Sequence, residues 1–268
     1  MNKNKLEQRR IEQEILRKKK FFRRFIFPST AAGIAVMLLM TGVISVPVFH
    51  SASNSHIFSP PSQIPWGKFV QVSNEDFGSH INVYYISWYG CPIGAADSWS
   101  FYLALSNNGN LSSFVSGHYS FSGDSFPDTP GLIFSPFSVG NVHFHPYYVY
   151  NQTMESPSNS PINGSKLSFG MIELKSELPP PIYSIDYSAM ETIPTSGFNG
   201  EPSGMVNHHV NTNVIITGPN GAWLLNGPLF SPGVLSGLTP SQILTSISGN
   251  QHVVQGSSSV SSAMREAQ

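Results

Sequence analysis

INVYYISWYGCPIGAADSWSFYLALSN, residues 81–107, joins a strand-like half to a helix-like half and contains the only cysteine of the 268-residue chain. β-Branched and aromatic residues dominate its first half, as in a strand that is buried on both faces. From Pro92 onward, apolar residues recur at spacings of three and four, which predicts a helix with proline in its first turn. We therefore expect Cys91 at the start of this helix, where unpaired N–H groups and the helix dipole favour a thiolate.

The segment CPIGAADSW, residues 91–99, also follows a known pattern. It resembles the Cys-Pro-x-Cys-Ala-Ala-x-x-Trp active-site segment of archaeal, membrane-anchored, thioredoxin-like proteins that are grouped as domain-of-unknown-function family 929. Weaker likeness at residues 124–130 and 235–243 extends the resemblance in patches over residues 67–249. The resemblance implies an α/β fold in which a thioredoxin-like sheet is flanked by helices and preceded by one N-terminal transmembrane helix.

The resemblance makes four residues the candidate catalytic positions: Cys91, Pro92, Gly94 and Asp97. Gly94 stands where the pattern has its second cysteine, so the internal disulfide of a dithiol oxidoreductase cannot form. Three hypotheses remain for Cys91: an inert side chain in a domain with a binding or structural role, which we favour, a monothiol oxidoreductase, or a covalent link to a partner. Asp97 would either tune the thiol or stabilise the helix start, and we favour the second.

The C-terminal half contains a hairpin signal and a helix signal. Gly218-Pro219-Asn220-Gly221 lies between two apolar runs and predicts a hairpin, and Thr239-Pro240 predicts the start of a terminal helix. Thioredoxin-like proteins generally carry a cis-proline just before this hairpin, beside the active-site cysteine. Here Asn213 takes that position, with Thr212 before it. Because a non-proline cis bond costs about 2.5 to 4 kcal/mol, we expect a trans peptide or a rearranged loop.

The N-terminal part of the chain is divided by charge. Residues 1–24 contain ten Lys and Arg against three Glu, a formal charge of +7, whereas the remainder carries four basic and twelve acidic residues. Residues 25–49 carry no charge. At about 1.5 Å per residue, they are long enough to cross a hydrocarbon core of about 30 Å. The positive-inside rule then predicts a cytoplasmic basic tail, a single-pass helix in contact with membrane lipid, and an extracytoplasmic location for the rest.

Two other interpretations of this N-terminal part are open. A cleaved signal peptide also has a basic start and an apolar middle, and residues 51–53 would serve as its cleavage site. The length of the basic and apolar segments favours retention. A basic tail can also bind nucleic acid, but a charge run next to a membrane span is more often topological and lipid-facing. We therefore predict no nucleic-acid partner, and an unidentified extracytoplasmic protein as the partner of the exported domain.

Beyond residue 49 the chain divides into a linker, a domain and a tail. Residues 50–66 are rich in Ser and Pro, which is typical of an extended spacer. Residues 67–250 form the predicted thioredoxin-like domain, with an aromatic, strand-rich insertion at about residues 114–165. Residues 251–268 are Ser-rich and are predicted to be a flexible tail.

Histidines offer a different class of function. The candidate metal ligands are two pairs, His143 with His145 and His208 with His209. The first pair would lie on one face of a strand, and the second pair precedes the hairpin. If the two pairs meet in space they could bind a metal ion, with His118 or Cys91 completing the set. We expect no other cofactor, because the chain has no nucleophile elbow, phosphate loop or dinucleotide fingerprint.

Two further features concern the predicted exterior. Three Asn-x-Ser/Thr triplets are candidate glycosylation sites, at Asn110, Asn151 and Asn163. Charged residues are scarce outside the N-terminal tail, so ion pairs would contribute little to the stability of the domain. This composition is compatible with an acidic exterior, in which carboxylates become protonated.

Overall fold

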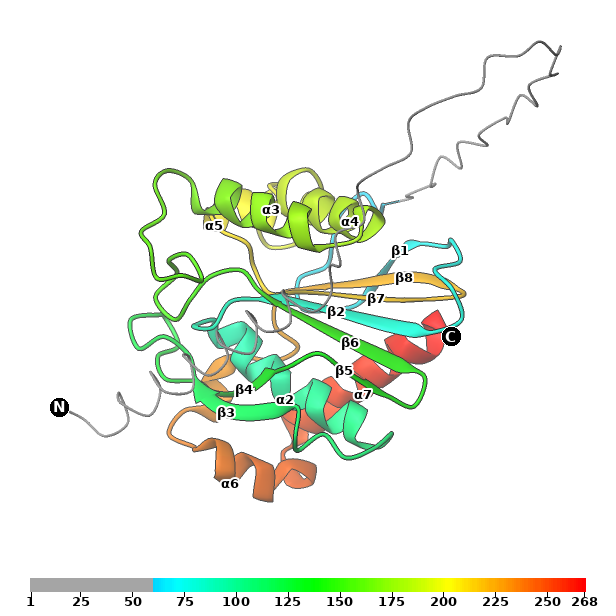
Figure 1. The fold of residues 1–268 in the computed structure, drawn as a ribbon, viewed down its shortest axis with the longest axis vertical. Coiled ribbons are helices and arrows are strands. Elements are labelled where there is room, and N and C mark those ends of the chain that lie inside the picture. The colour runs from blue at the N-terminus through cyan, green and yellow to red at the C-terminus, as the bar shows by residue number, and fades with distance from the viewer. Residues whose placement is uncertain (1–59) are drawn as a thin grey trace, which may run out of the picture. The chain divides into compact units, whose positions relative to one another are not determined.

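A six-stranded sheet forms the centre of the computed structural model, which describes residues 60–268 (Figure 1). The strands are β1 Val70–Ser73, β2 Ile81–Ser87, β3 Val115–Tyr119, β4 Pro130–Phe134, β5 Phe137–Val139, β6 Val142–Tyr148, β7 Asn213–Gly218 and β8 Gly221–Asn226. Their order in the sheet is β1-β8-β7-β2-β6-β5, and β3 and β4 pair antiparallel as a separate ribbon.

β2 is the central strand, as its apolar sequence predicts. It pairs in parallel with β6 and antiparallel with β7, and the other neighbouring strands of the sheet pair antiparallel. The predicted insertion at residues 114–165 therefore includes residues that belong to the main sheet. β6 belongs to the main sheet, and only the β3–β4 ribbon stands apart from it. The pairing of β2 with β6 joins distant parts of the chain, which local patterns do not reveal.

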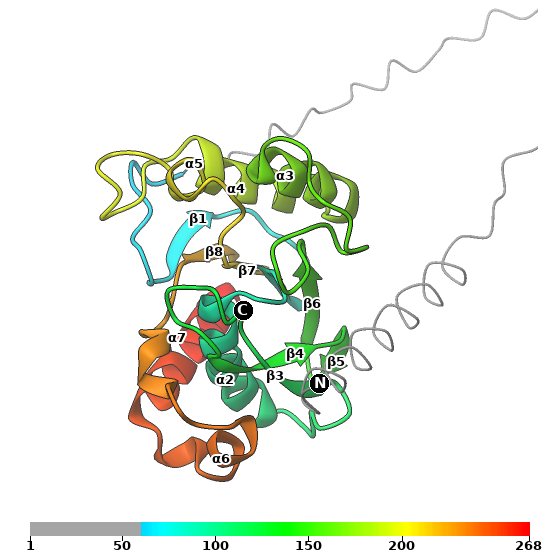
Figure 2. The same ribbon diagram turned by 90° about the vertical axis from the view of Figure 1, so that its left-hand side faces the viewer.

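Helices cover both faces of the sheet (Figures 1 and 2). On one face lie α2 (Pro92–Ser106) and α7 (Gln251–Ala267), with the short α6 (Pro240–Thr245) beyond them. The other face carries α3 (Lys166–Glu177), α4 (Pro180–Glu191) and the one-turn α5 (Ser203–Asn207). Two 3₁₀ turns, η1 (Pro232–Leu235) and η2 (Ile247–Gly249), flank α6. The described chain is thus a mixed α/β unit with a sheet between two helical layers.

The predicted flexible tail at residues 251–268 is wrong, because most of this segment forms α7. Its buried residues recur at helical spacings, and several are small: Val253, Gly256, Ser257, Val260, Ala263, Met264 and Ala267. A Cβ built on Gly256 would lie 2.2 Å from Ser100 Oγ of α2, so the two helices are in close contact. Small residues permit this approach, and they also give the segment the composition of a loop.

The hairpin prediction is confirmed. β7 and β8 are joined through the Gly218–Gly221 pair, so Pro219 and Asn220 form a two-residue turn. Thr239 caps α6 with a complete capping box and a first-turn proline follows, as expected. However, α6 is short, and the long terminal helix is α7 rather than the one predicted from Thr239.

The folded unit begins earlier than predicted. Ile64 is fully buried and forms a parallel bridge with Thr195, and Trp66 forms a parallel bridge with Asn226. The last residues of the predicted linker 50–66 therefore belong to the domain. No helix in residues 60–268 combines the length and apolar character needed to cross a bilayer. The predicted span at residues 25–49 lies outside the described residues.

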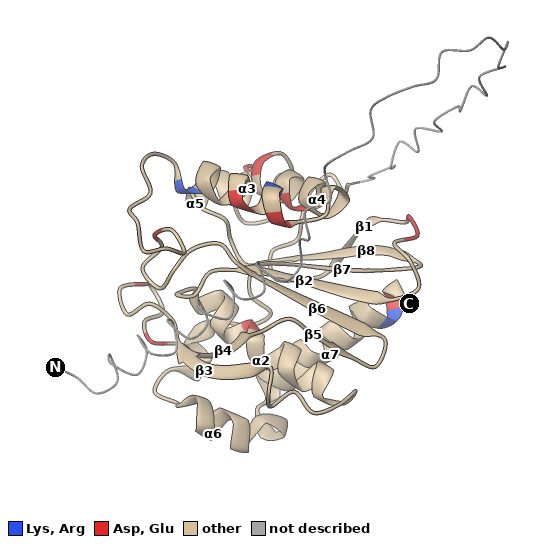
Figure 3. Cartoon of the chain, in the orientation of Figure 1, with Lys and Arg blue, Asp and Glu red and all other residues tan. Residues whose placement is uncertain are grey.

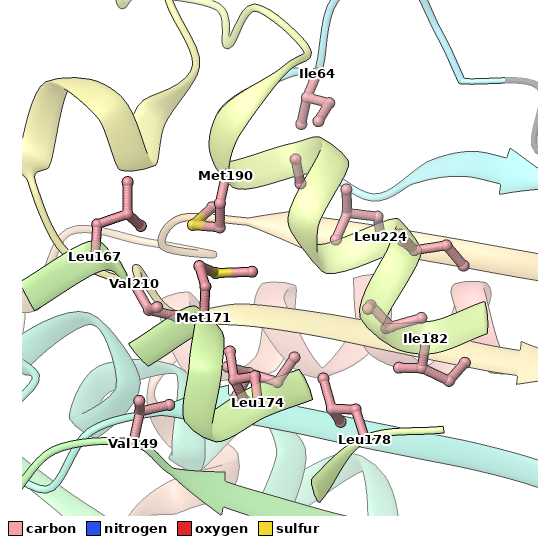
Figure 4. Close-up of a cluster of buried hydrophobic side chains, with 14 of the residues drawn as sticks. Ile64, Val149, Leu167, Met171, Leu174, Leu178, Ile182, Met190, Val210 and Leu224 are labelled. Atoms are coloured by element: carbon pink, nitrogen blue, oxygen red, sulfur yellow. The ribbon is translucent and has the colours of Figure 1, made fainter. Parts of the chain in front are cut away.

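The face covered by α3 and α4 holds a large hydrophobic cluster (Figure 4). Aliphatic and methionine side chains from both helices pack on the sheet, including Leu174, Ile182 and Met190, which are each at most 2% exposed. Charged residues are sparse over much of the described chain, and acidic ones gather on this same helical layer (Figure 3). The core therefore rests on apolar packing.

Candidate functional site

Cys91 caps the N-terminus of α2, as the sequence predicts. The preceding strand β2 ends at Ser87, and the backbone N–H of Gly94 donates to Cys91 Sγ at 3.4 Å. Pro92 occupies the first turn of the helix, where its missing N–H costs no intrahelical hydrogen bond. The strand, the turn and the proline-led helix together place the thiol at a strand-to-helix junction.

Thr212 lies against the thiol from the loop that leads into β7. Its Oγ1 is hydrogen bonded to Cys91 Sγ at 3.1 Å and to Ser87 Oγ at 2.9 Å. Thr212 therefore lies beside the cysteine, whereas the side chain of Asn213, which was expected there, is hydrogen bonded to Asp186 of α4. No cis peptide bond occurs in residues 60–268, so the Thr212–Asn213 bond is trans as expected. Two hydroxyl groups, rather than a proline ring, border the thiol.

Gly94 occupies a position where a side chain would displace the Ser87 hydroxyl. A Cβ built there would lie 2.2 Å from Ser87 Oγ and 3.2 Å from Thr212 Oγ1. A cysteine at this position would collide with the Ser87 hydroxyl. The space of a second thiol is thus filled by Ser87, a residue that the sequence analysis did not identify as part of the site.

Burial determines the ionisation of Cys91. Its side chain is 4% exposed, and this desolvation raises the pKa of the thiol above its ordinary value. Hydrogen bonds from Gly94 and Thr212 lower the pKa, but by less than burial raises it. The thiolate expected from the helix N-terminus is therefore not the favoured form. Hydrogen bonds at a helix start do not compensate for the loss of water around a charged sulfur.

Two loops close over the residue before the cysteine. The N–H of Phe121, after β3, donates to the carbonyl of Gly90 at 2.8 Å. A Cβ on Gly90 would lie 2.2 Å from the Gln152 carbonyl oxygen, so this position requires glycine. Phe121 and Gln152 are far from Gly90 in the sequence. A glycine directly before the cysteine was the one local sign of this close approach.

Asp97 does not stabilise the helix start, contrary to our preference. It lies beyond the first turn of α2, is fully buried, and accepts a hydrogen bond from the Leu229 N–H at 2.9 Å. Its other oxygen, Oδ2, has no partner. Burial raises the pKa of Asp97 well above its ordinary value. Asp97 therefore fastens the loop after β8 to α2, and its hydrogen bond goes to that loop rather than to the thiol.

The two histidine pairs do not meet. His143 and His145 share one face of β6, with ring centroids 6.4 Å apart, as predicted. His145 contacts Asn82 and Tyr84 of β2. The second pair follows α5: His208 caps this helix, and the ring of His209 lies 6.3 Å from that of Trp88.

The other proposed metal ligand, His118, contacts the Tyr89 carbonyl at 3.1 Å. Burial lowers the pKa of His118 to about 4, which favours the neutral imidazole. Within residues 60–268, no three His, Cys, Asp or Glu side chains are arranged to hold a metal ion. The four-histidine site suggested by the sequence is therefore not formed by these residues.

The three glycosylation triplets differ in access. Asn110 and Asn163 are exposed. Asn151 is 3% exposed, and its Nδ2 donates to Asn159 Oδ1 at 2.8 Å and to Glu155 Oε2 at 3.3 Å. Nδ2 is the atom that would carry a glycan, so modification of Asn151 is incompatible with this folded loop.

Comparison with known proteins identifies the family. The family model described as "Domain of unknown function (DUF929)" matches residues 68–266, and the chain belongs to this family. The match spans the main sheet and both helical layers. No curated protein and no solved structure shows significant similarity to the chain.

Proposed function

We propose that this member of the DUF929 family is a redox-inactive, thioredoxin-type domain with a binding or structural role, held outside the cell membrane by residues 25–49. The order of elements supports the thioredoxin-type assignment. β2, α2 and the parallel β6 form the first half, and the β7–β8 hairpin followed by α7 forms the second. Cys91 lies at the first strand-to-helix junction of that arrangement.

The packing of Gly94 against Ser87 carries the redox-inactive part of the proposal. A thiol-disulfide cycle needs an attacking thiolate and a group that resolves the mixed disulfide. The position of the second thiol is closed by the Ser87 hydroxyl, 2.2 Å from where a Cβ would stand. The remaining thiol is buried and its pKa is raised by that burial. Both observations support a redox-inactive domain.

A monothiol oxidoreductase is the second candidate. The hydrogen bonds that Cys91 Sγ makes with Gly94 and Thr212 favour it, because both stabilise a thiolate once the thiol is exposed to solvent. This activity would need an opening of the loops around Gly90, and an external thiol to release the product.

The alkylation rate of Cys91 separates the two candidates. It would be measured against pH for the full chain, both folded and unfolded in urea, alongside a disulfide-reduction assay of wild type and Cys91→Ser. We expect the folded thiol to react far more slowly than the unfolded one, and Cys91→Ser to leave the assay unchanged. Fast alkylation below the ordinary thiol pKa, with activity lost in Cys91→Ser, would overturn the proposal.

A double variant provides the positive control for that assay. Ser87→Ala removes the hydroxyl that blocks position 94, and Gly94→Cys then supplies the missing thiol. In this double variant, we expect the thiol introduced by Gly94→Cys to form a disulfide with Cys91 under oxidising conditions. Gly94→Cys alone should destabilise the domain, because the Ser87 hydroxyl remains in its way.

The location is tested separately from the chemistry. The charge of +7 in residues 1–24 and the uncharged residues 25–49 support a single-pass anchor with the domain outside. Protease added to intact cells should digest an epitope tag at the C-terminus and spare a tag at the N-terminus. Protection of the C-terminal tag, or release of the chain from membranes at high pH, would refute this topology.

A further inference from the structure

A buried carboxyl lies on the sheet face opposite α2. Asp186 projects from α4 and is fully buried. Its Oδ1 accepts a hydrogen bond of 2.7 Å from Nδ2 of Asn213, the first residue of β7. Asn213 is also fully buried and directly follows Thr212, whose hydroxyl contacts Cys91. The pair therefore joins a helix of one layer to the strand start directly behind the candidate site.

Two oxygens of this pair have no partner. They are Asp186 Oδ2 and Asn213 Oδ1, and both are buried. A carboxylate oxygen and an amide carbonyl oxygen are both acceptors, so neither can satisfy the other. A proton on Asp186 would convert Oδ2 into a donor, and Asn213 Oδ1, in the amide already bonded to this carboxyl, is an acceptor without a partner. The missing element of the pair is thus one proton, since buried polar atoms are rarely left unpaired.

We propose that Asp186 is a neutral carboxylic acid in the folded domain, joined to Asn213 by two reciprocal hydrogen bonds, and that this pair is a proton-dependent latch between α4 and β7. In one bond Asn213 Nδ2 donates to Asp186 Oδ1, and in the other the acid O–H donates to Asn213 Oδ1. Loss of the proton removes the second bond and leaves a buried charge facing an unpaired oxygen. The latch is independent of the function proposed for Cys91.

The groups around Asp186 do not compensate a negative charge. The ionisable side chains that interact with it are the phenols of Tyr150 and Tyr183. Of the elements packed against α4, β7 and α5 carry no ionisable residue, and only the exposed His208 and the partly buried His209 follow α5. The remaining element, α3, carries Lys166, Glu173, Lys175 and Glu177, and neither lysine is among the groups that shift the pKa of Asp186.

Burial dominates the ionisation of Asp186 and raises its pKa to about 7, while the hydrogen bond from Asn213 lowers it. A carboxyl whose pKa is higher in the folded state than in the unfolded state stabilises the fold most at low pH. Its contribution is complete below the unfolded pKa of about 4 and is lost as pH rises toward 7. The domain should therefore be most stable under acidic conditions.

Nuclear magnetic resonance on the wild-type chain tests the proton directly. The side-chain carboxyl carbon of Asp186, labelled with ¹³C and assigned by sequence, would be followed from pH 3 to pH 9. We expect its titration near pH 7. Titration near the ordinary aspartate value of about 4 would overturn the latch.

A variant tests the consequence for stability. Asp186→Asn keeps the shape and replaces the acid by an amide, which donates to Asn213 Oδ1 at every pH. Between pH 4 and 7, we expect the folding equilibrium constant of the wild type to fall by up to about tenfold more per pH unit than that of Asp186→Asn. Asp97, the other buried acid, remains in both proteins, so only the difference between them is interpreted. An unchanged slope would contradict the proposal.

Glu191→Gln is the matched control, because it changes a partly exposed carboxyl on the same helix. It should leave the slope as in wild type. A change as large as that of Asp186→Asn would show that the effect belongs to the net charge of the domain and would also overturn the latch.

Discussion

The helices on the two faces of the sheet are packed differently. Under α2 and α7 the helices carry many small residues, and the Cβ that Gly256 lacks would lie 2.2 Å from Ser100 Oγ. Under α3 and α4 the contacts come from aliphatic and methionine side chains, as Figure 4 shows. Where α2 meets α7, close approach of the backbones gives the stability, although aromatic side chains such as Tyr85, Trp99 and Phe101 fill the space between α2 and its other neighbours. Under α3 and α4 the stability comes from buried apolar volume. We call the α2–α7 contact the small-residue face and the layer of α3 and α4 the large-residue face. The first cannot accept added atoms, and the second cannot lose them.

Each face also contains one buried acid with a raised pKa. Asp97 belongs to α2 and holds the loop after β8 through the Leu229 N–H. Asp186 belongs to α4 and holds the start of β7 through Asn213. Both carboxyls join a helix to a chain segment at the same end of the hairpin, one from each face. Acidic conditions should therefore stabilise the packing of both helical layers. This agrees with the scarcity of charged residues outside the N-terminal tail.

The largest effect is expected on the large-residue face. Leu174→Ala removes a side chain that is 2% exposed and leaves a cavity between α3 and the sheet. We expect a loss of about 2 to 5 kcal/mol in the free energy of unfolding, measured by urea denaturation. Ile172→Ala on the same helix is the control, because Ile172 is 68% exposed. Equal losses in the two variants would mean that this layer is not a packed core.

A smaller loss of stability is expected on the small-residue face, where it comes from adding atoms rather than from removing them. Gly256→Val adds atoms where Ser100 already stands, and overpacking of this kind costs about 1 to 3 kcal/mol. Ser100→Gly should recover part of the loss when combined with it. At Gly249, where a Cβ would meet nothing within 4 Å, the same substitution should cost less. A Gly256→Val chain as stable as wild type would show that α2 and α7 do not approach closely.

The difference between the faces also explains which parts of the fold the sequence could predict. The Pro219-Asn220 turn, the Thr239 cap and the Cys91 junction depend on residues adjacent in the chain, and all three were predicted. α7 was not, because its many serine residues give the segment the composition of a loop, although Val253, Val260 and Met264 recur at helical spacings. The parallel pairing of β6 with β2 was also missed, since nothing local to either strand specifies it.

The candidate site likewise has features that the sequence predicted and features that it did not. The position of Cys91 and the nearness of Thr212 followed from local patterns and from the family resemblance. The burial of Cys91 did not, because it depends on loops brought over Gly90 from two distant parts of the chain. The role of Ser87 was hidden as well. It is the last residue of a predicted strand, and only the folded structure shows that its hydroxyl fills the space beside Gly94.

The smallest predicted effect compares how the helices of the two layers begin. The side chain of Asn250 caps α7 by accepting hydrogen bonds from His252 N–H at 3.1 Å and Val253 N–H at 3.3 Å. Ser165 caps α3 by accepting one, from Ser168 N–H at 3.2 Å. Asn250→Ala should therefore lower the free energy of unfolding by about 1 kcal/mol, and Ser165→Ala by less.

Urea denaturation would measure both losses, and amide hydrogen exchange would locate them in the first turn of each helix. Asn250→Asp is the control, because aspartate caps a helix as well as asparagine does and adds a favourable charge at the N-terminus. It should retain the stability of wild type. If Asn250→Asp loses as much as Asn250→Ala, the cap is not what holds the start of α7.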